Sequence, residues 1–143
     1  MKILISACLL GIPCRYDGKA KPQPWAEALA ARHDLVPVCP EQLGGLPTPR
    51  APSERRGDHV VMNTGADVTE QYRRGAAEAA RLCALLGCQA AVLKERSPSC
   101  GKGQVYDGTF SRTLTAGDGV TAAVLAEMGV PVYGESQVEE LLK

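Results

Sequence analysis

The alternation of hydrophobic and polar stretches along the chain predicts short buried strands separated by helices. Apolar runs of strand length occur at residues 2–7, 35–38, 59–62, 90–93 and 130–133. Patterns typical of helices lie between them, at residues 25–33, 67–87 and 118–128, with a short helix at the C-terminal end. This alternation predicts an α/β fold, a single Rossmann-like domain over residues 1–143 with a mostly parallel sheet flanked by helices.

Local signals refine where the elements begin and end. The residues expected to cap helices at their N-termini are Asp67, Asp118 and Ser136. The helix that follows Asp118 is expected to bury a face made of Val120, Val124 and Met128. Residues 44–57 hold three prolines, three glycines and three arginines without periodicity, which is typical of a functional loop or flap. Pro37 is unfavourable for a central strand.

Composition excludes several classes of partner. The chain has 143 residues, 45% of them hydrophobic and 22% charged, as in ordinary globular domains. Sixteen basic and sixteen acidic residues cancel, so no overall field attracts a nucleic acid polymer or an anionic membrane. No apolar segment approaches the roughly 18 residues needed to span a bilayer.

Six cysteines are many for a domain of this size with an adequate core. The apolar stretch at the N-terminus is too short for a secretory signal, so we expect a reducing, cytoplasmic location. Cysteines in that setting bind metals or react more often than they form disulfides. Cys83 lies on the apolar stripe of the long predicted helix and Cys88 just after it, so both are interpreted as packing residues.

Three other cysteines follow the carboxyl ends of predicted strands. Cys8, Cys39 and Cys100 each lie in a turn at such an end, which is the ligand-binding edge of open α/β sheets. Three thiolates there would suit zinc or an iron–sulfur cluster. Their spacing contains no paired C-x-x-C motif, so spacing alone favours packing or incidental thiols. Cys14 is either a fourth ligand or a loop thiol.

Other catalytic chemistries have weaker support. A cysteine hydrolase needs a histidine base, and the only two histidines, His33 and His59, fit solvated or structural roles. The glycines at 101–103 and 117–119 match neither the P-loop nor the dinucleotide fingerprint. Glu41, two residues after Cys39, is either an ordinary surface glutamate or a carboxylate that exchanges a proton in a crevice.

A set of short motifs runs along residues 2–135. The segments are SACLLG at 6–11, RYDG at 15–18, CPE at 39–41, GLPTPR at 45–50, DVT at 67–69, LK at 93–94, SPSCG at 97–101 and YDGTF at 106–110. In this order they resemble the thiouracil desulfidase family. Together these motifs are specific to that family, which was once catalogued only as a bacterial domain of unknown function.

The resemblance implies a site and an activity. It implies a 4Fe-4S cluster held by Cys8, Cys39 and Cys100, with one iron left without a protein ligand, and catalytic roles for Glu41 and Ser97. The implied reaction is hydrolysis of a small thiolated pyrimidine, namely 2- or 4-thiouracil, 4-thiouridine or its 5′-monophosphate, to the uracil compound and sulfide.

Two further points stay open at this stage. A monophosphate would need cationic partners, for which Arg15, Lys102 and Arg112 are candidates in or near motif loops. The alternatives to an enzyme are a non-catalytic iron–sulfur or zinc protein that carries electrons or sulfur, and a binding module whose thiols merely pack. No long exposed apolar helix face indicates an oligomeric partner.

Overall fold

The computed structural model describes residues 1–143 and contains a four-stranded sheet in the order β2-β1-β5-β8. All neighbouring strands in this sheet pair in parallel. The strands are β1 (Lys2–Ser6), β2 (Asp34–Val38), β5 (Ala90–Leu93) and β8 (Val132–Gly134). Together with helices on both faces, this single small domain confirms the predicted α/β fold.

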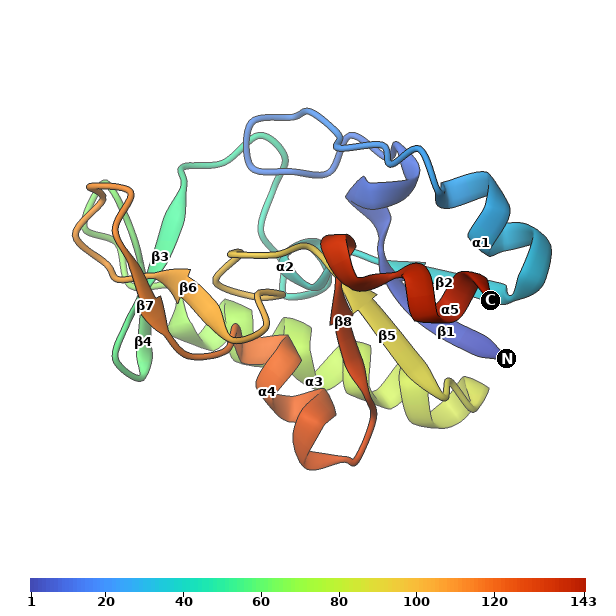
Figure 1. Cartoon of the computed structure of the whole chain (residues 1–143). Coiled ribbons are helices and arrows are strands. Elements are labelled where there is room, and N and C mark those ends of the chain that lie inside the picture. Colours follow the sequence, from blue (N-terminus) through green and yellow to red (C-terminus); the bar gives the residue numbers. More distant parts are fainter.

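The helices cover the two faces of the sheet in pairs (Figure 1). They are α1 (Ala26–Arg32), α3 (Thr69–Leu86), α4 (Val120–Glu127) and α5 (Glu139–Leu142). Ile3 and Ile5 of β1 pack with Leu29 of α1, whereas Leu4 between them packs with Ala79 of α3 and Leu125 of α4. Successive side chains of β1 therefore point to opposite faces, as expected for a strand buried on both sides. No helix is long and apolar enough to cross a membrane.

The sheet has a switch point beside β1. The chain crosses from β1 to β2 on one side and later returns to β5 on the other. Because the three strands are parallel, their carboxyl ends lie side by side along the same edge, the carboxyl edge of the sheet. Two short helices begin at this edge, η1 (Ala7–Leu10) after β1 and α2 (Pro40–Leu43) after β2. Pro37 is tolerated in β2 because β2 is an outermost strand, with a hydrogen-bonded neighbour on one side only.

Two antiparallel hairpins lie together beyond the main sheet (Figure 1). Their strands are β3 (Ser53–Arg56) with β4 (His59–Met62), and β6 (Gln104–Tyr106) with β7 (Leu114–Ala116). The expected loop at 44–57 is therefore wrong for its last residues, which form β3. This strand has no apolar periodicity to reveal it, and it forms by pairing with the apolar β4.

The predicted helix caps are wrong in detail. Val68 and Gly119, not Asp67 and Asp118, occupy the N-cap positions of α3 and α4. Each aspartate instead accepts a nearby backbone N–H, Asp67 from Thr69 at 2.9 Å and Asp118 from Gly103 at 2.7 Å. The hydroxyl of Ser136 donates to Glu95, and Ser136 itself lies within the short helix η2 (Glu135–Gln137).

The buried face of α4 also differs from the expected one. Thr121, Ala122 and Leu125 are buried, whereas Val120 and Val124 are half-buried and Met128 is exposed. The helix is apolar nearly all round, so its sequence does not distinguish one face. Its packing against α3 and the sheet decides which residues are covered.

Candidate functional site

A cavity of about 530 Å³ opens at the sheet edge where β1, β2 and β5 end. Its walls come from the turns after these strands and from the two hairpins. The lining includes all five residues singled out from the sequence: Cys8, Cys39, Glu41, Ser97 and Cys100. Segments that are up to 92 residues apart in the chain thus contribute to one site. Cys83 and Cys88 are buried in the core near α3, as predicted.

The three predicted ligand thiols differ in exposure. Cys8 and Cys100 are buried and Cys39 is half-buried. Burial raises the pKa of Cys100 to about 12, although the Ser6 hydroxyl donates to its Sγ at 3.4 Å. A hydrogen bond with Cys14, together with burial, raises the pKa of Cys39 above its usual value. With their pKa values raised, Cys39 and Cys100 stay protonated at neutral pH in the protein alone, and metal binding would release these protons.

Cys14 lies in the same cavity as the three predicted ligands. Its carbonyl oxygen accepts hydrogen bonds from Cys39 Sγ at 3.7 Å and from Arg50 Nη2 at 3.0 Å. Its own pKa is raised: a hydrogen bond with Cys39 lowers it, but one with Cys8 and burial outweigh that effect. The residue is therefore a buried fourth thiol of the site and not an exposed loop thiol.

The thiols of the cavity are a donor set that suits an iron–sulfur cluster. No three His, Cys, Asp or Glu side chains lie in an arrangement that would hold a single metal ion. In a cluster each thiolate binds a different iron, so the sulfurs can stand further apart, and thiolates are the donors such clusters take.

Glu41 lies in the first turn of α2 and is held at both oxygens. Arg50 Nη2 donates to Oε2 at 2.9 Å, and the Tyr72 hydroxyl donates to Oε1. The Arg50 side chain is only 2% exposed. Burial lowers the pKa of its guanidinium, but the Glu41 carboxylate outweighs burial and raises it. Burial and the same carboxylate raise the pKa of Tyr72, so its phenol remains a donor to Glu41.

The position of Glu41 depends on a close crossing of α2 and α3. A Cβ on Gly75 of α3 would overlap the carbonyl oxygen of Pro40, and one on Gly44 would overlap that of Gln71. Two glycines facing each other thus let the two backbones touch. This contact brings the first turn of α2 within hydrogen-bonding reach of Tyr72.

Ser97 organises the turn that carries Cys100. Its Oγ accepts the backbone N–H groups of Ser99 and Cys100, both at 3.1 Å. Both bonds use the oxygen as acceptor, so the hydroxyl proton remains available to a group in the cavity.

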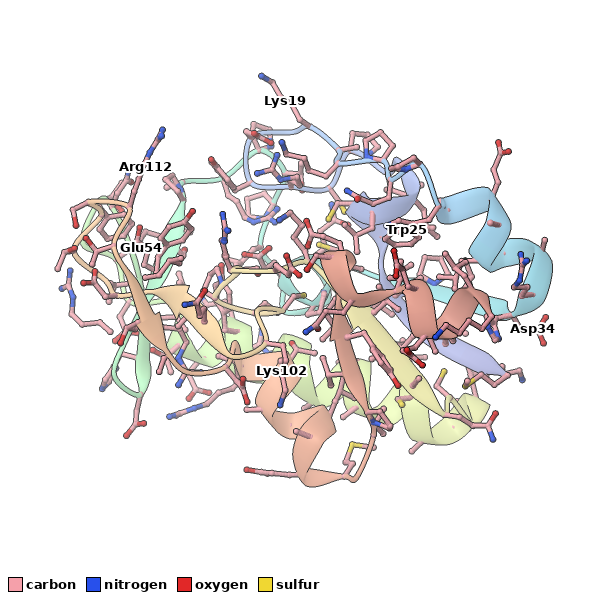
Figure 2. The ribbon with its side chains drawn as sticks, viewed as in Figure 1. Lys19, Trp25, Asp34, Glu54, Lys102 and Arg112 are labelled. Carbon is pink, nitrogen blue, oxygen red and sulfur yellow. The ribbon has the colours of Figure 1, made fainter.

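The three cationic candidates for contacts with a monophosphate do not all lie at the cavity. Arg15 and Arg112 line the cavity, but Lys102 does not. The Nζ of Lys102 pairs instead with Asp118 Oδ2 at 3.5 Å, and Figure 2 shows it beside α4, away from Arg112. Lys94, which follows β5 directly and pairs with Glu135 at 2.9 Å, also lines the cavity.

Sequence reasoning assigned no role to Arg50 and Tyr72, which hold Glu41, or to Lys94, which lines the cavity. Strand-end placement, the signal that identified the cysteines, would also have found Lys94. Tyr72 matches the apolar stripe of α3, and its buried hydroxyl contact depends on α2, which is distant in sequence. Arg50 lies in a loop without periodicity, so only its three-dimensional contacts reveal its role.

Comparison with known proteins identifies the family of the chain. The model of the 2-thiouracil desulfurase family matches residues 3–137. The chain belongs to this family. One relative is the uncharacterized protein YbbK of Bacillus subtilis (strain 168), with 41% identity over 98% of this chain and 99% of YbbK. The solved structure of TudS, described as a [4Fe-4S]-dependent thiouracil desulfidase, superposes with a TM-score of 0.92. It is 50% identical, over 98% of this chain and 94% of that one.

Proposed function

We propose that this protein is an iron–sulfur-dependent desulfidase that hydrolyses thiolated uracil compounds to the uracil compound and sulfide. The observation that carries the proposal is the convergence of Cys8, Cys39, Cys100 and Glu41 on one cavity. Membership of the 2-thiouracil desulfurase family and the likeness to TudS support it. The whole chain, residues 1–143, acts as one desulfidase domain, and its six unpaired cysteines suit a reducing cytoplasm.

In this proposal Cys8, Cys39 and Cys100 hold a 4Fe-4S cluster. Three protein thiolates leave one iron without a protein ligand, as catalytic zinc sites leave one position open. When bound, the cluster supplies a Lewis acid with an affinity for the soft sulfur of a thiocarbonyl group. Cys14 is not a ligand here.

Glu41 is the proton-transfer group. One lone pair of each of its oxygens accepts a bond from Tyr72 or Arg50, and the remaining lone pairs are free for water. Glu41 takes a proton from the water that adds to the thiocarbonyl carbon and returns a proton as the C–S bond breaks. The reaction consumes one water, releases sulfide and involves no net oxidation or reduction.

Ser97 positions the reactants. Since its oxygen is already an acceptor for two backbone N–H groups, its hydroxyl orients by donating, either to the pyrimidine or to the water. A substrate monophosphate would meet Arg15 and Arg112 at the cavity wall. The substrates proposed are 2- and 4-thiouracil, 4-thiouridine and its 5′-monophosphate.

The test is sulfide release from this panel of thiopyrimidines by the anaerobically reconstituted protein. We expect sulfide and the matching uracil compound in equal amounts from the wild type. Glu41→Gln and Ser97→Ala should keep the visible absorbance of the cluster and lose most of the turnover, while Glu127→Gln, an exposed glutamate on α4, should behave as wild type. A cluster that forms without any sulfide release would favour an electron- or sulfur-carrying protein instead.

A further inference from the structure

The loop between β6 and β7, residues 107–113, brings two unusual residues to the cavity. Phe110 and Arg112 both line it, and both have left-handed backbone conformations, with φ of 56° and 60°. Non-glycine residues rarely adopt such φ values, and where they do the surrounding structure must hold them there. The loop therefore has a fixed shape.

A buried carboxylate enforces that shape. Glu54 of β3 is 9% exposed, and its Oε1 accepts the backbone N–H groups of Gly108 and Phe110, each at 3.0 Å. No cation pairs with Glu54, so these amides are what offset the cost of burying it. Figure 2 labels Glu54 and Arg112 on the adjoining hairpins.

A second contact fixes the loop to the same strand. Arg56 Nη2 donates to the Gly108 carbonyl at 2.6 Å. A Cβ on Gly108 would lie 2.9 Å from the Arg55 carbonyl oxygen, so only glycine allows this approach of the two backbones. The loop is thus a preorganised wall of the cavity and not a freely moving lid.

We infer that the ring of Phe110 is the face on which the pyrimidine ring of the substrate stacks, and that Glu54 is the residue that positions it. This inference rests on the proposed function for its substrate class. Two other aromatic residues line the cavity: Tyr16 already carries the Arg15 guanidinium 5.6 Å from its ring centroid, and Tyr106 belongs to strand β6 and not to the loop. Phe110 is the aromatic residue whose left-handed backbone conformation the fold holds in place at the cavity that the thiols line. A planar, weakly polar base is the ligand that an aromatic ring favours.

The test measures binding without turnover. Ligand-detected NMR titration of the cluster-free protein with uracil should give saturable binding that Phe110→Leu weakens about 5- to 100-fold, the range of a base–aromatic stack. Phe110→Tyr, which keeps the ring, should restore the affinity. Ser111→Ala, a change at an exposed position of the same loop that does not line the cavity, should leave it unchanged.

Glu54 is tested in the same titration. Glu54→Ala should weaken uracil binding, whereas Glu54→Gln, which keeps a carbonyl acceptor for the two amides, should retain most of it; thermal unfolding verifies that each variant is folded. Unchanged uracil affinity in folded Phe110→Leu, or no uracil binding by the wild type, would overturn the inference. Weakened binding in Phe110→Leu together with no sulfide release from any thiopyrimidine would uphold it and refute the proposed desulfuration, so the two failures are distinguishable.

Discussion

The hydroxyl of Tyr72, on the buried face of α3, donates a hydrogen bond to Oε1 of Glu41, on the first turn of α2. Because Arg50 holds the other oxygen, the carboxylate has a single orientation relative to the cavity. The orientation of the proposed proton-transfer group is therefore set jointly by Tyr72 of α3 and by Arg50 of the loop after α2.

Removing the Tyr72 hydroxyl tests this arrangement. In Tyr72→Phe we expect kcat to fall about 10- to 100-fold, the effect of losing a hydrogen bond to a charged group, with KM and the cluster absorbance little changed. Tyr133→Phe is the matched control, since Tyr133 is half-buried and makes no hydrogen bond through its hydroxyl. A fall in melting temperature with unchanged kcat would show that Tyr72 only packs.

The ion pair of Arg50 with Glu41 predicts a loss of stability. Arg50→Gln leaves the half-buried Glu41 carboxylate without its cation, which should lower the free energy of unfolding by about 3 kcal/mol. In Arg81→Gln, where the arginine is 62% exposed and pairs with Glu78, the loss should stay below about 1 kcal/mol. Urea denaturation of both variants measures the difference, and equal losses would contradict the contribution of the buried pair.

The close crossing of α2 and α3 predicts that a Gly→Ala substitution destabilises the protein, which is the opposite of its usual effect within a helix. Within an open helix, Gly→Ala stabilises by up to about 1 kcal/mol. Gly75→Ala should instead destabilise by about 1–3 kcal/mol, because the new methyl group overlaps the Pro40 carbonyl and must push α2 away. The same displacement should reduce sulfide release. A stabilised Gly75→Ala variant in urea denaturation would refute the close contact.

The lowered pKa of Asp67 predicts that the stability of the folded protein depends on pH. Hydrogen bonds from Thr69 and His59 lower the pKa of Asp67 to about 2, below the value of about 3.9 expected in the unfolded chain. A carboxyl whose pKa is depressed by folding stabilises the protein above about pH 4 and loses that contribution progressively as the pH falls through its folded-state pKa of about 2. Asp67→Asn should therefore be less stable than wild type at pH 7, and this difference in stability should shrink to a small part of its value by pH 2. Urea denaturation at both pH values gives the answer, and a constant difference would count against it.

Strand-end placement accounts for much of what the sequence reveals. The apolar runs that precede Cys8, Cys39 and Cys100 are parallel strands, and the rule that the carboxyl ends of such strands share an edge correctly predicts that the three thiols lie at one cavity. The proposal that these thiols are ligands rests on the motif resemblance, since their spacing alone also allows simple packing.

Contacts between elements account for what the sequence did not reveal. The strand β3 has no apolar alternation and exists by pairing with β4. Tyr72 acquires its role only when α2 crosses α3, and Arg50 only when the loop after α2 folds back onto Glu41. The uniformly apolar α4 offers no preferred face until it packs. In each case the deciding interaction joins residues whose local patterns do not signal one another.

In the proposed mechanism the cavity thiols hold the cluster with which this protein releases sulfide. The decisive experiment measures the sulfide released from 4-thiouracil by anaerobically reconstituted wild type, Cys8→Ala and Cys83→Ala. We predict one sulfide per uracil formed in wild type and in Cys83→Ala, whose substitution lies in the core away from the cavity, and none in Cys8→Ala. Sulfide release by Cys8→Ala at the wild-type rate would contradict this mechanism.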